Sequence, residues 1–300
     1  MANRTYRTAT LAAALAGALA GAALPLVANA AADLVEMAYA KAWPNTAAAA
    51  GAGYLAPTAA QLAAAQALFV QLLQGKASAA VAEQARALGW ELHSQAREGG
   101  VLSVVTEARG QQTGQGLYAF FSGGRHALQA PHVPTDGLTG EILLRYAGDG
   151  LPRALAWNTV PRKVADLAHL DGTYLIAFSL AFAQVYPREK IMQLHGFDVD
   201  RRRTAAAADS GAIVSAGHDR PSKELAEAVR CMRQQVEPQT RLFGADVREL
   251  GGTTNTVAKA LRETRYDLFV HLEMALPLRK RLLVDGALRR ALLECLGGVR

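Results

Sequence analysis

The sequence predicts an α/β fold: a mixed sheet with helices on both faces, preceded by an N-terminal helical segment. From about residue 120 onward, short runs rich in β-branched and aromatic residues alternate with helix-forming runs, which is typical of a sheet covered on both faces. Three earlier strand-like runs, between residues 90 and 121, are separated only by short breaks containing glycine, which indicates hairpins and hence a mixed sheet. With 300 residues, 51% of them hydrophobic, the chain is long enough for one large core.

The first residues predict export. Arg4 and Arg7 precede a run of small apolar residues that ends in Ala-Asn-Ala at 28–30. A basic start, an apolar run and an A-x-A motif are the layout of a cleaved secretory signal, so residues 1–30 are expected to be a signal peptide. The alternative is an uncleaved membrane anchor. No later run has the ~18 uninterrupted apolar residues that a span needs, so the mature protein is expected in a bacterial periplasm or outside the cell, with no stable membrane span.

Two segments are expected between the signal and the main domain. Residues 31–56 are rich in alanine and glycine, which indicates a linker. Residues 57–89 contain two helix-forming runs, with Thr58 placed to cap the first and Gly75 to end it. The α/β domain is therefore expected to occupy residues 90–300.

Within that domain the period and composition of each run assign its element. Strands are expected at 90–96, 101–108, 116–123, 126–132, 153–160, 190–197, 211–217, 240–247 and 266–275. Helices are expected at 140–147, 163–170, 173–186, 222–236, 254–264 and 277–296.

Charge and cysteine content narrow the class of protein. The net charge is +6, but the basic residues are dispersed apart from the run 201–203, and no aromatic residues are interleaved with them. Nucleic acid is therefore not expected as a partner. Cys231 and Cys295 both fall in helix-like runs. A disulfide between them and two buried free thiols are both compatible with the sequence.

Polar residues stand at the ends of several predicted strands. His132, Asn158 and His195 each lie at or near the end of one, while His271 and Glu273 lie two apart in the last strand and so face the same side. In open α/β sheets, ligands bind beyond the carboxyl ends of the strands. The sequence therefore predicts one site built from these residues.

The composition of that site favours zinc. Zinc hydrolases commonly use three histidine or carboxylate ligands, leaving a fourth position for a water whose pKa falls to roughly 7. His132 and Asp136 supply a nearby pair, and His195 supplies a third ligand. Two alternatives stay open for the carboxylate: Asp198 is a rival ligand, and Asp136 is also placed to cap the helix that follows it.

Glu273 is the predicted general base for that water. A glutamate within a strongly apolar strand is costly to bury without a task or a partner. His271 is predicted to orient a metal ligand, with a purely structural core histidine as the alternative.

The motifs "APH…D…TG", "QLHGF" and "FVHLEMA" occur in an order that resembles the zinc carboxypeptidase-like hydrolases. Within that group the chain is most similar to the poly-γ-glutamate hydrolase type, with N-formylglutamate amidohydrolases further off. The resemblance covers roughly residues 100–280. It implies a mixed α/β sheet, one zinc held by His132, Asp136 and His195, and Glu273 as base. The chain departs from the usual H-x-x-E pair, because Thr135 stands where the acid is expected and the aspartate follows one residue later.

Three further residues are predicted to bind substrate. Arg162 is placed to hold a substrate carboxylate through a planar two-pronged contact, with a solvated arginine as the alternative. Asn158 lies in the same stretch, and Asn255 ends a glycine-containing loop before a helix whose amides suit an anion. The expected substrate is a small peptide-like or γ-glutamyl molecule.

Two other function classes remain as alternatives. A serine hydrolase would use Ser215, but the nucleophile elbow G-x-S-x-G has Ile213 in place of its first glycine. An exported ligand-binding protein would use the same cleft without metal or catalysis, since one fold supports both.

Overall fold

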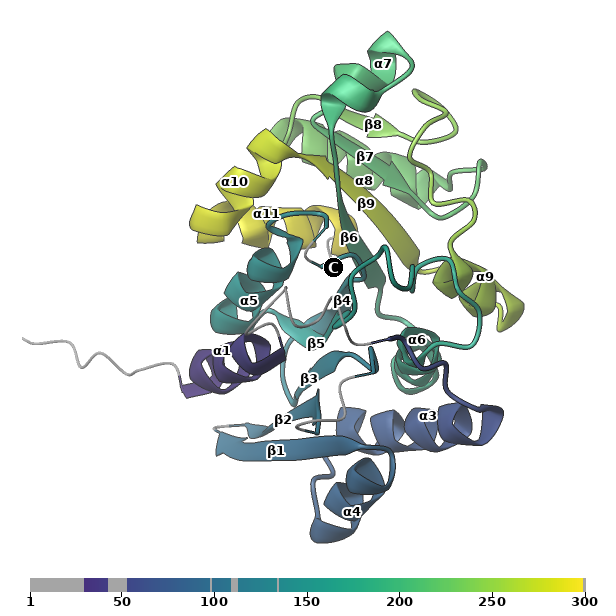
Figure 1. The fold of residues 1–300 in the computed structure, drawn as a ribbon. Helices are drawn as coiled ribbons and strands as arrows, with labels where there is room; N and C mark the ends of the chain where they lie inside the picture. The colour runs from purple at the N-terminus through teal and green to yellow at the C-terminus, as the bar shows by residue number, and fades with distance from the viewer. Residues whose placement is uncertain (1–29, 43–52, 98, 109–112, 134, 299–300) are drawn as a thin grey trace, which may run out of the picture.

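The computed structural model describes residues 30–42, 53–97, 99–108, 113–133 and 135–298. Its centre is a nine-stranded mixed sheet in the order β1-β2-β3-β5-β4-β6-β9-β7-β8, with helices on both faces (Figure 1). The predicted α/β fold is therefore confirmed. Residues 1–29, which make up nearly all of the predicted signal peptide, lie outside the described residues.

The strands follow the short apolar runs of the sequence. They are β1 (Trp90–Arg97), β2 (Gly100–Glu107), β3 (Leu117–Phe121), β4 (Arg125–Ala130), β5 (Pro152–Trp157), β6 (Ile191–Phe197), β7 (Ala212–Ser215), β8 (Thr240–Leu242) and β9 (Phe269–Ala275).

Strand direction explains where a site can form. β1, β2 and β3 form an antiparallel meander, and β3 pairs antiparallel with β5. β5, β4, β6 and β9 are all parallel, whereas β7 runs antiparallel to β9 and pairs with a parallel β8. The carboxyl ends of four neighbouring strands therefore meet at one edge of the sheet, where α/β proteins place their ligands.

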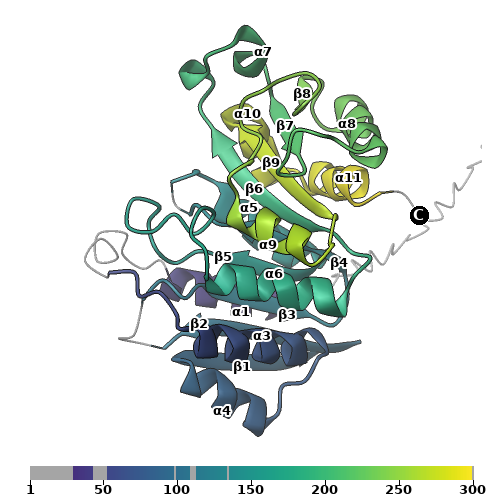
Figure 2. The ribbon, with the colours of Figure 1, turned by 90° about the vertical axis from the view of Figure 1, so that its right-hand side faces the viewer.

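Helices cover each face of the sheet and enclose a separate core (Figures 1 and 2). One face carries α1 (Ala30–Ala42), α5 (Thr139–Asp149), α8 (Lys223–Gln235), α10 (Leu276–Val284) and α11 (Gly286–Gly297). The other carries α3 (Ala59–Leu73), α4 (Ala79–Ala87), α6 (Tyr174–Val185) and α9 (Thr256–Glu263). A 3-10 turn, η1 (Val199–Arg201), and the short α7 (Ala205–Ala208) follow β6.

Alternation along the parallel strands places polar residues on one face. In β6, Met192 and Leu194 belong to the core under α5 and α10, whereas Ile191 belongs to the core under α6 and α9. Gln193 and His195 share the side of Ile191, because side chains alternate along a strand. The carboxyl half of the α6–α9 face is thus polar where its amino half is apolar.

The predicted start of the first helix of the 57–89 segment is confirmed. Thr58 caps α3 by accepting a hydrogen bond from the Gln61 amide at 3.2 Å, and the Gln61 side chain in turn accepts one from the Thr58 amide at 2.9 Å. This reciprocal pair satisfies two amides that a helix N-terminus otherwise leaves without partners.

The structure corrects the linker prediction in its first part. Residues 30–42 form α1, in which Val35 and Ala38 are buried and Tyr39 packs against Trp157 with ring centroids 6.1 Å apart. The apolar residues of this alanine-rich segment recur at helical spacing. They pack against α5 and the neighbouring strands. Residues 43–52 of the predicted linker lie outside the described residues.

Three other elements differ from their predictions. The helix expected at 163–170 is a pair of turns, and Asp166, which lies between them, bonds His132 and Arg162 through its side chain. The strand expected at 240–247 ends at Leu242. The C-terminal helix is two helices, since Asp285 stops α10 and caps α11 by accepting from the Leu288 amide at 3.0 Å.

The two cysteines form a disulfide. Cys231 in α8 and Cys295 in α11 are joined across 64 residues of sequence, with their Cα atoms 5.4 Å apart. This settles the choice between a bridge and two thiols that the sequence left open. Among the described residues, no helix combines the length and apolar character that crossing a bilayer would need.

Loss of the disulfide is expected to destabilise the protein without changing its fold. Replacing both cysteines by alanine should lower the free energy of unfolding by ~2–4 kcal/mol, because the unfolded chain is no longer closed into a long loop. Urea unfolding of the variant and of the wild type with and without reductant measures this loss. Identical midpoints for oxidised and reduced wild-type protein would contradict the expectation.

Candidate metal centre

Three buried side chains meet at the carboxyl edge of the parallel strands. His132 follows β4, Asp136 lies four residues later, and His195 is in β6. Their facing atoms form a triangle: His195 Nδ1 lies 3.0 Å from His132 Nδ1 and 3.3 Å from Asp136 Oδ2, and His132 Nδ1 lies 3.2 Å from Asp136 Oδ2. The structure thus brings together the three residues that the sequence singled out as ligands.

The loop between β4 and α5 directs Asp136 inward. Leu138 begins α5 with a φ of 74° and no side-chain cap, and the Thr139 hydroxyl bonds the backbone carbonyl of Asp136 rather than its carboxylate. The carboxylate instead accepts from the Gly196 amide at 3.2 Å. Asp136 therefore does not cap the helix, which was the alternative reading of this residue.

The outer nitrogens of both histidines face acceptors. His132 Nε2 lies 2.8 Å from Asp166 Oδ1, and His195 Nε2 lies 2.9 Å from Gln193 Oε1. An acceptor opposite Nε2 requires the proton there, which leaves Nδ1 of each neutral ring with its lone pair. When both rings are neutral, Nδ1 of each ring and Oδ2 of Asp136 are three acceptors facing one another; without a cation, a proton on an Nδ1 must bond Asp136.

Three converging lone pairs fit a metal ion. Four ligands ~2.0–2.1 Å from a tetrahedral zinc lie roughly 3.3 Å from one another, close to the separations seen here. Two histidine nitrogens and a carboxylate oxygen are a donor set that zinc accepts. The residues present therefore fit a zinc ion held by His132, Asp136 and His195.

The charge balance of the triad agrees with this fit. Burial raises the pKa of Asp136, but the hydrogen bonds with His132 and His195 outweigh burial and lower it. Burial lowers the pKa of His132, but its bonds to Asp136 and Asp166 outweigh burial and raise it. Burial lowers the pKa of His195 to about 4 against its bond to Asp136. A proton on His132 is what a cation would displace.

Glu273 lies beside the triad. It is in β9, paired in register with His195 of β6, and its side chain faces the same side of the sheet. Burial, with the nearby Asp136 carboxylate, raises the pKa of Glu273 to about 8. A cation in the triad would favour its ionised form, the form that accepts a proton.

His271 packs between the triad and a glycine loop. Its ring centroid lies 4.4 Å from that of His195, and its Nε2 lies 3.9 Å from Glu273 Oε1. A Cβ on Gly252 would come within 2.6 Å of the His271 ring, so only glycine allows this approach. His271 therefore supports His195 and Glu273 sterically, and its predicted role in orienting a ligand remains a prediction.

A second set of side chains that could bind a metal also includes His195. Donor atoms of His195, His271 and Glu273 lie within 4.8 Å of one another. One nitrogen of His195 faces the first triad and the other is bonded to Gln193, so a second ion would need a lone pair already in use. The triad of His132, Asp136 and His195 is therefore the better candidate for a metal site.

Other residues predicted for the site lie nearby with partners of their own. Arg162, 41% exposed at its side chain, donates from Nε to Asp166 at 2.8 Å. The side-chain NH₂ of Asn158 donates to the Val160 carbonyl and its oxygen accepts from the Val160 amide. Asn255 caps α9 while donating to Gln193. Substrate binding by these three residues stays a prediction, and the two asparagines would have to give up these bonds to take part.

The rival residues lie outside the triad. Asp198 is exposed, accepts from the Asp200 amide and pairs with Arg201. Ser215 is buried, donates to the Gly251 carbonyl at 2.6 Å and accepts from the Gly217 amide at 2.9 Å. Its hydroxyl is thus used to fasten a loop, and it has no histidine partner among the described residues.

No direct signal in the sequence points to three supporting residues: Asp166, Gln193 and Arg279. Asp166 holds His132 through a hydrogen bond. Burial raises the pKa of Asp166, but this bond and the charge of Arg162 outweigh burial and lower the pKa to about 2. Arg279, only 6% exposed, donates to the Gly137 carbonyl and to the Phe197 carbonyl, the latter at 3.3 Å. It thereby joins the loop of Asp136 to the end of β6.

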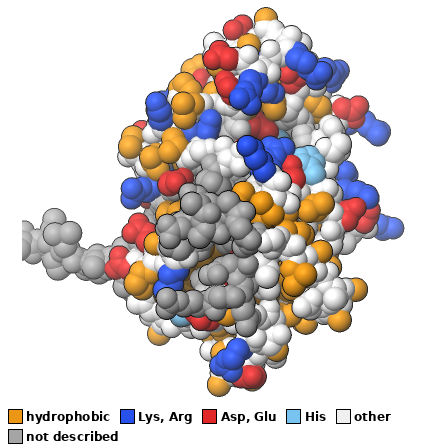
Figure 3. Space-filling view, in the orientation of Figure 1, with side chains coloured by type: hydrophobic (Ala, Val, Ile, Leu, Met, Phe, Trp, Pro, Cys, Tyr) orange, Lys and Arg blue, Asp and Glu red, His pale blue; other side chains and the backbone are white. Residues whose placement is uncertain are grey.

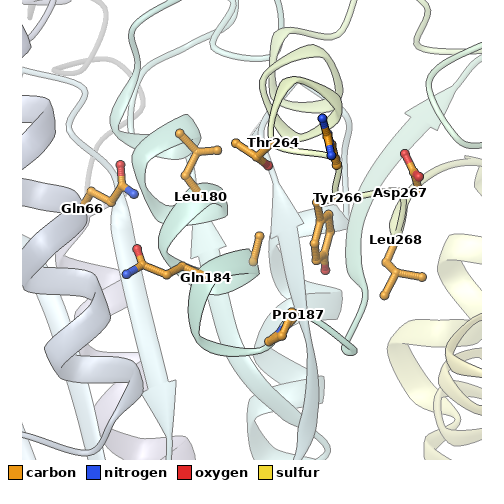
Figure 4. A pocket seen from close by; sticks show the side chains of 10 residues that line it. Gln66, Leu180, Gln184, Pro187, Thr264, Tyr266, Asp267 and Leu268 are labelled. Carbon is orange, nitrogen blue, oxygen red and sulfur yellow. The ribbon is translucent and has the colours of Figure 1, made fainter.

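The described part of the molecule also has a charged surface area and a cavity. On the face seen in Figure 1, the space-filling view shows Lys and Arg side chains beside a histidine, above an apolar area (Figure 3). A cavity of about 540 Å³ lies elsewhere, between α6 and the segment Thr264–Leu268 that leads into β9 (Figure 4). It opens near the amino ends of the parallel strands, and its lining contains no histidine.

Comparisons with known proteins do not identify the chain. No family model and no curated protein sequence matches it. An aspartoacylase family protein from Mesorhizobium loti superposes with a TM-score of 0.37 and 14% identity, over 69% of this chain and 65% of that one. A metallo-carboxypeptidase from Burkholderia cenocepacia gives 0.38 and 11%, over 77% and 67%. The chain spans about two thirds of either structure, and the assignment of the site rests on its own geometry.

Removal of His132 is expected to abolish metal binding. Wild-type protein should bind one zinc per chain, with an affinity that rises from pH 6 to pH 8 because the metal must displace a proton from His132. His132→Ala should bind none, whereas His93→Ala, on the distant strand β1, should bind like wild type. Isothermal titration with zinc at several pH values measures both effects. A pH-independent affinity, or retention of zinc by His132→Ala, would contradict this ligand set.

Loss of the Arg279 contacts is expected to loosen the triad. Arg279→Met keeps most of the buried volume but frees the Gly137 and Phe197 carbonyls, so zinc affinity should fall by ~10-fold or more. Arg281→Met is the matched control, because Arg281 lies on the same helix and bonds Glu237 and Val236 instead. Equal zinc affinity in the two variants would show that Arg279 does not hold the Asp136 loop.

Proposed function

We propose that this protein is an exported, zinc-dependent amide or peptide hydrolase. The observation that carries the proposal is the convergence of His132 Nδ1, His195 Nδ1 and Asp136 Oδ2 beside a buried Glu273. Three ligands with an adjacent carboxylate are the parts that hydrolysis by an activated water requires.

Each residue has a defined task in that reaction. Zinc, when bound by His132, Asp136 and His195, lowers the pKa of a water and polarises a carbonyl. Asp166 and Gln193 keep the two histidines in the tautomer that offers Nδ1. The Gly196 amide and Arg279 keep the Asp136 carboxylate against β6.

Glu273 is the proposed proton carrier. As a carboxylate it accepts the proton of the attacking water, and as an acid it returns a proton to the departing nitrogen of the amide. A buried position, 8% exposed, keeps its pKa above that of an ordinary glutamate, which suits a group that must both take up and release a proton near neutral pH.

Arg162 is the proposed contact for a substrate carboxylate. Of the three guanidinium nitrogens of Arg162, only Nε has a hydrogen-bond partner among the described residues. The two terminal nitrogens are available for a two-pronged contact with a carboxylate. Its charge lies close enough to bear on the pKa of His132 and Glu273. This supports a small peptide-like or γ-glutamyl substrate with a free carboxylate near the scissile bond.

Export is supported by two features. The Cys231–Cys295 bridge is typical of oxidising compartments, and the N-terminal residues have the layout of a secretory signal. We therefore assign the protein to the bacterial periplasm or the extracellular space. A metal-free binding protein is the remaining alternative, but it has no use for three converging lone pairs.

Glu273→Gln tests the proposed chemistry. The amide is nearly isosteric but cannot accept a proton, so turnover should fall by ~10²–10⁴-fold while zinc binding and unfolding stay close to wild type. Activity is measured on a panel of α- and γ-linked glutamyl peptides and cell-wall peptides, with the zinc content of each preparation determined in parallel.

His132→Ala separates base from ligand in the same assay, since it should lose zinc together with activity. If the zinc-loaded Glu273→Gln variant hydrolyses the best substrate at the wild-type rate, Glu273 is not the base. If zinc-loaded wild type hydrolyses no member of the panel but binds one tightly, the binding protein is the better assignment.

A further inference from the structure

A chain of buried polar side chains crosses the otherwise apolar face under α6 and α9. It runs from Ser179 of α6 through Gln129 of β4 and Gln193 of β6 to His195, and Asn255 joins it at Gln193. All of these residues are 3% exposed or less. The catalytic proposal uses only the bond between Gln193 and His195. The other hydrogen bonds of this series need their own explanation.

The bonds at the α6 end of this series determine which group donates and which accepts along it. The Ser179 hydroxyl donates to the Leu175 carbonyl at 2.7 Å, and a carbonyl can only accept. Ser179 must therefore accept from Gln129, whose NH₂ group lies 2.8 Å away. The carbonyl oxygen of Gln129 is then left to accept from the NH₂ group of Gln193 at 3.0 Å. Gln193 is thereby forced to present its oxygen on the other side.

The α9 end reaches the same result independently. Asn255 caps α9, so its side-chain oxygen accepts from the Ala258 amide at 3.0 Å. Its NH₂ group must then face Gln193, and it lies 2.5 Å from Gln193 Oε1. Two backbone groups, the Leu175 carbonyl and the Ala258 amide, thus impose one orientation on the Gln193 amide.

We infer that this Ser179–Gln129–Gln193 relay, with Asn255, is a positioning device that fixes the tautomer of His195. The oxygen of Gln193 lies 2.9 Å from His195 Nε2, so that nitrogen carries the proton and Nδ1 keeps its lone pair toward the triad. The tautomer follows from the relay alone, while its value for holding zinc rests on the proposed function.

Energetics support a specific role for the relay. Each buried amide gives up its hydration, and its internal hydrogen bonds return little more than the bonds to water that it loses. Neighbouring positions on the same face, Ala127 of β4 and Ile191 of β6, are apolar and pack well. Apolar residues at 129 and 193 would fill this face as well but would leave the His195 ring free to exchange its tautomer.

The experiment compares Gln193→Met with Gln193→Glu. Methionine removes the acceptor, whereas glutamate loses the bond to Gln129 but retains an oxygen that faces His195 and accepts from Asn255. Long-range ¹H–¹⁵N spectra of metal-free protein labelled at histidine identify the protonated nitrogen of His195, and competition with a chelator gives the affinity for zinc. Wild type and Gln193→Glu should show the Nε2–H tautomer. Gln193→Met should populate both tautomers and bind zinc ~10–100-fold more weakly.

Leu194→Ala is the matched control. Leu194 lies between Gln193 and His195 but faces the opposite core, so this variant should lose stability in urea while keeping the tautomer and the zinc affinity. A wild-type His195 protonated at Nδ1, or a Gln193→Met variant with the wild-type tautomer, overturns the inference. Should Gln193→Met not fold, the wild-type and Gln193→Glu spectra still decide it. An Nε2–H tautomer in a wild type that binds no zinc would uphold the relay and refute the proposed function.

Discussion

The convergence of three metal-binding side chains is the constraint on which the arrangement of the site depends. His132, Asp136 and His195 present acceptor atoms to one another at 3.0–3.3 Å, a contact that is unfavourable unless a cation or a proton lies between them. Keeping them there requires neighbours that cannot relax: Asp166 behind His132, Gln193 behind His195, and the Gly196 amide on Asp136. Hydrogen bonds therefore hold the three side chains at the carboxyl edge of the sheet, which rests on the two apolar cores.

Glycine makes this crowding possible at two points. Gly196 has no Cβ, and one would lie 2.6 Å from the Arg279 guanidinium carbon. Gly252, with a φ of 59°, brings its loop against the His271 ring. At both positions a side chain would push a supporting group away from the triad. The site is therefore set by the close approach of backbone as much as by its charged residues.

Much of this arrangement could be predicted from the sequence, because local patterns record it. Alternation in the strands and the polar residues near their ends place His132, His195 and Glu273 at one edge, and Asp136 lies within 3.3 Å of both histidines. Other features could not be predicted. The run 163–170 predicts a helix, and nothing in it indicates that the Asp166 carboxylate bonds His132 and Arg162. Gln193 appeared to be one polar residue in an apolar strand, since its partners Gln129 and Asn255 are brought to it only by tertiary structure.

Helix α1 shows the opposite limit of sequence reasoning. Its alanine-rich composition favours a linker, yet Val35 and Ala38 are buried and Tyr39 packs on Trp157, whose indole donates to the Gly140 carbonyl at the start of α5. Gly140 lies four residues after Asp136, so α1 buttresses the helix that carries the metal-binding loop. A segment that composition assigns to a tether thus contributes to holding Asp136. The triad draws support from the first described residues of the chain as well as from the strands that supply its ligands.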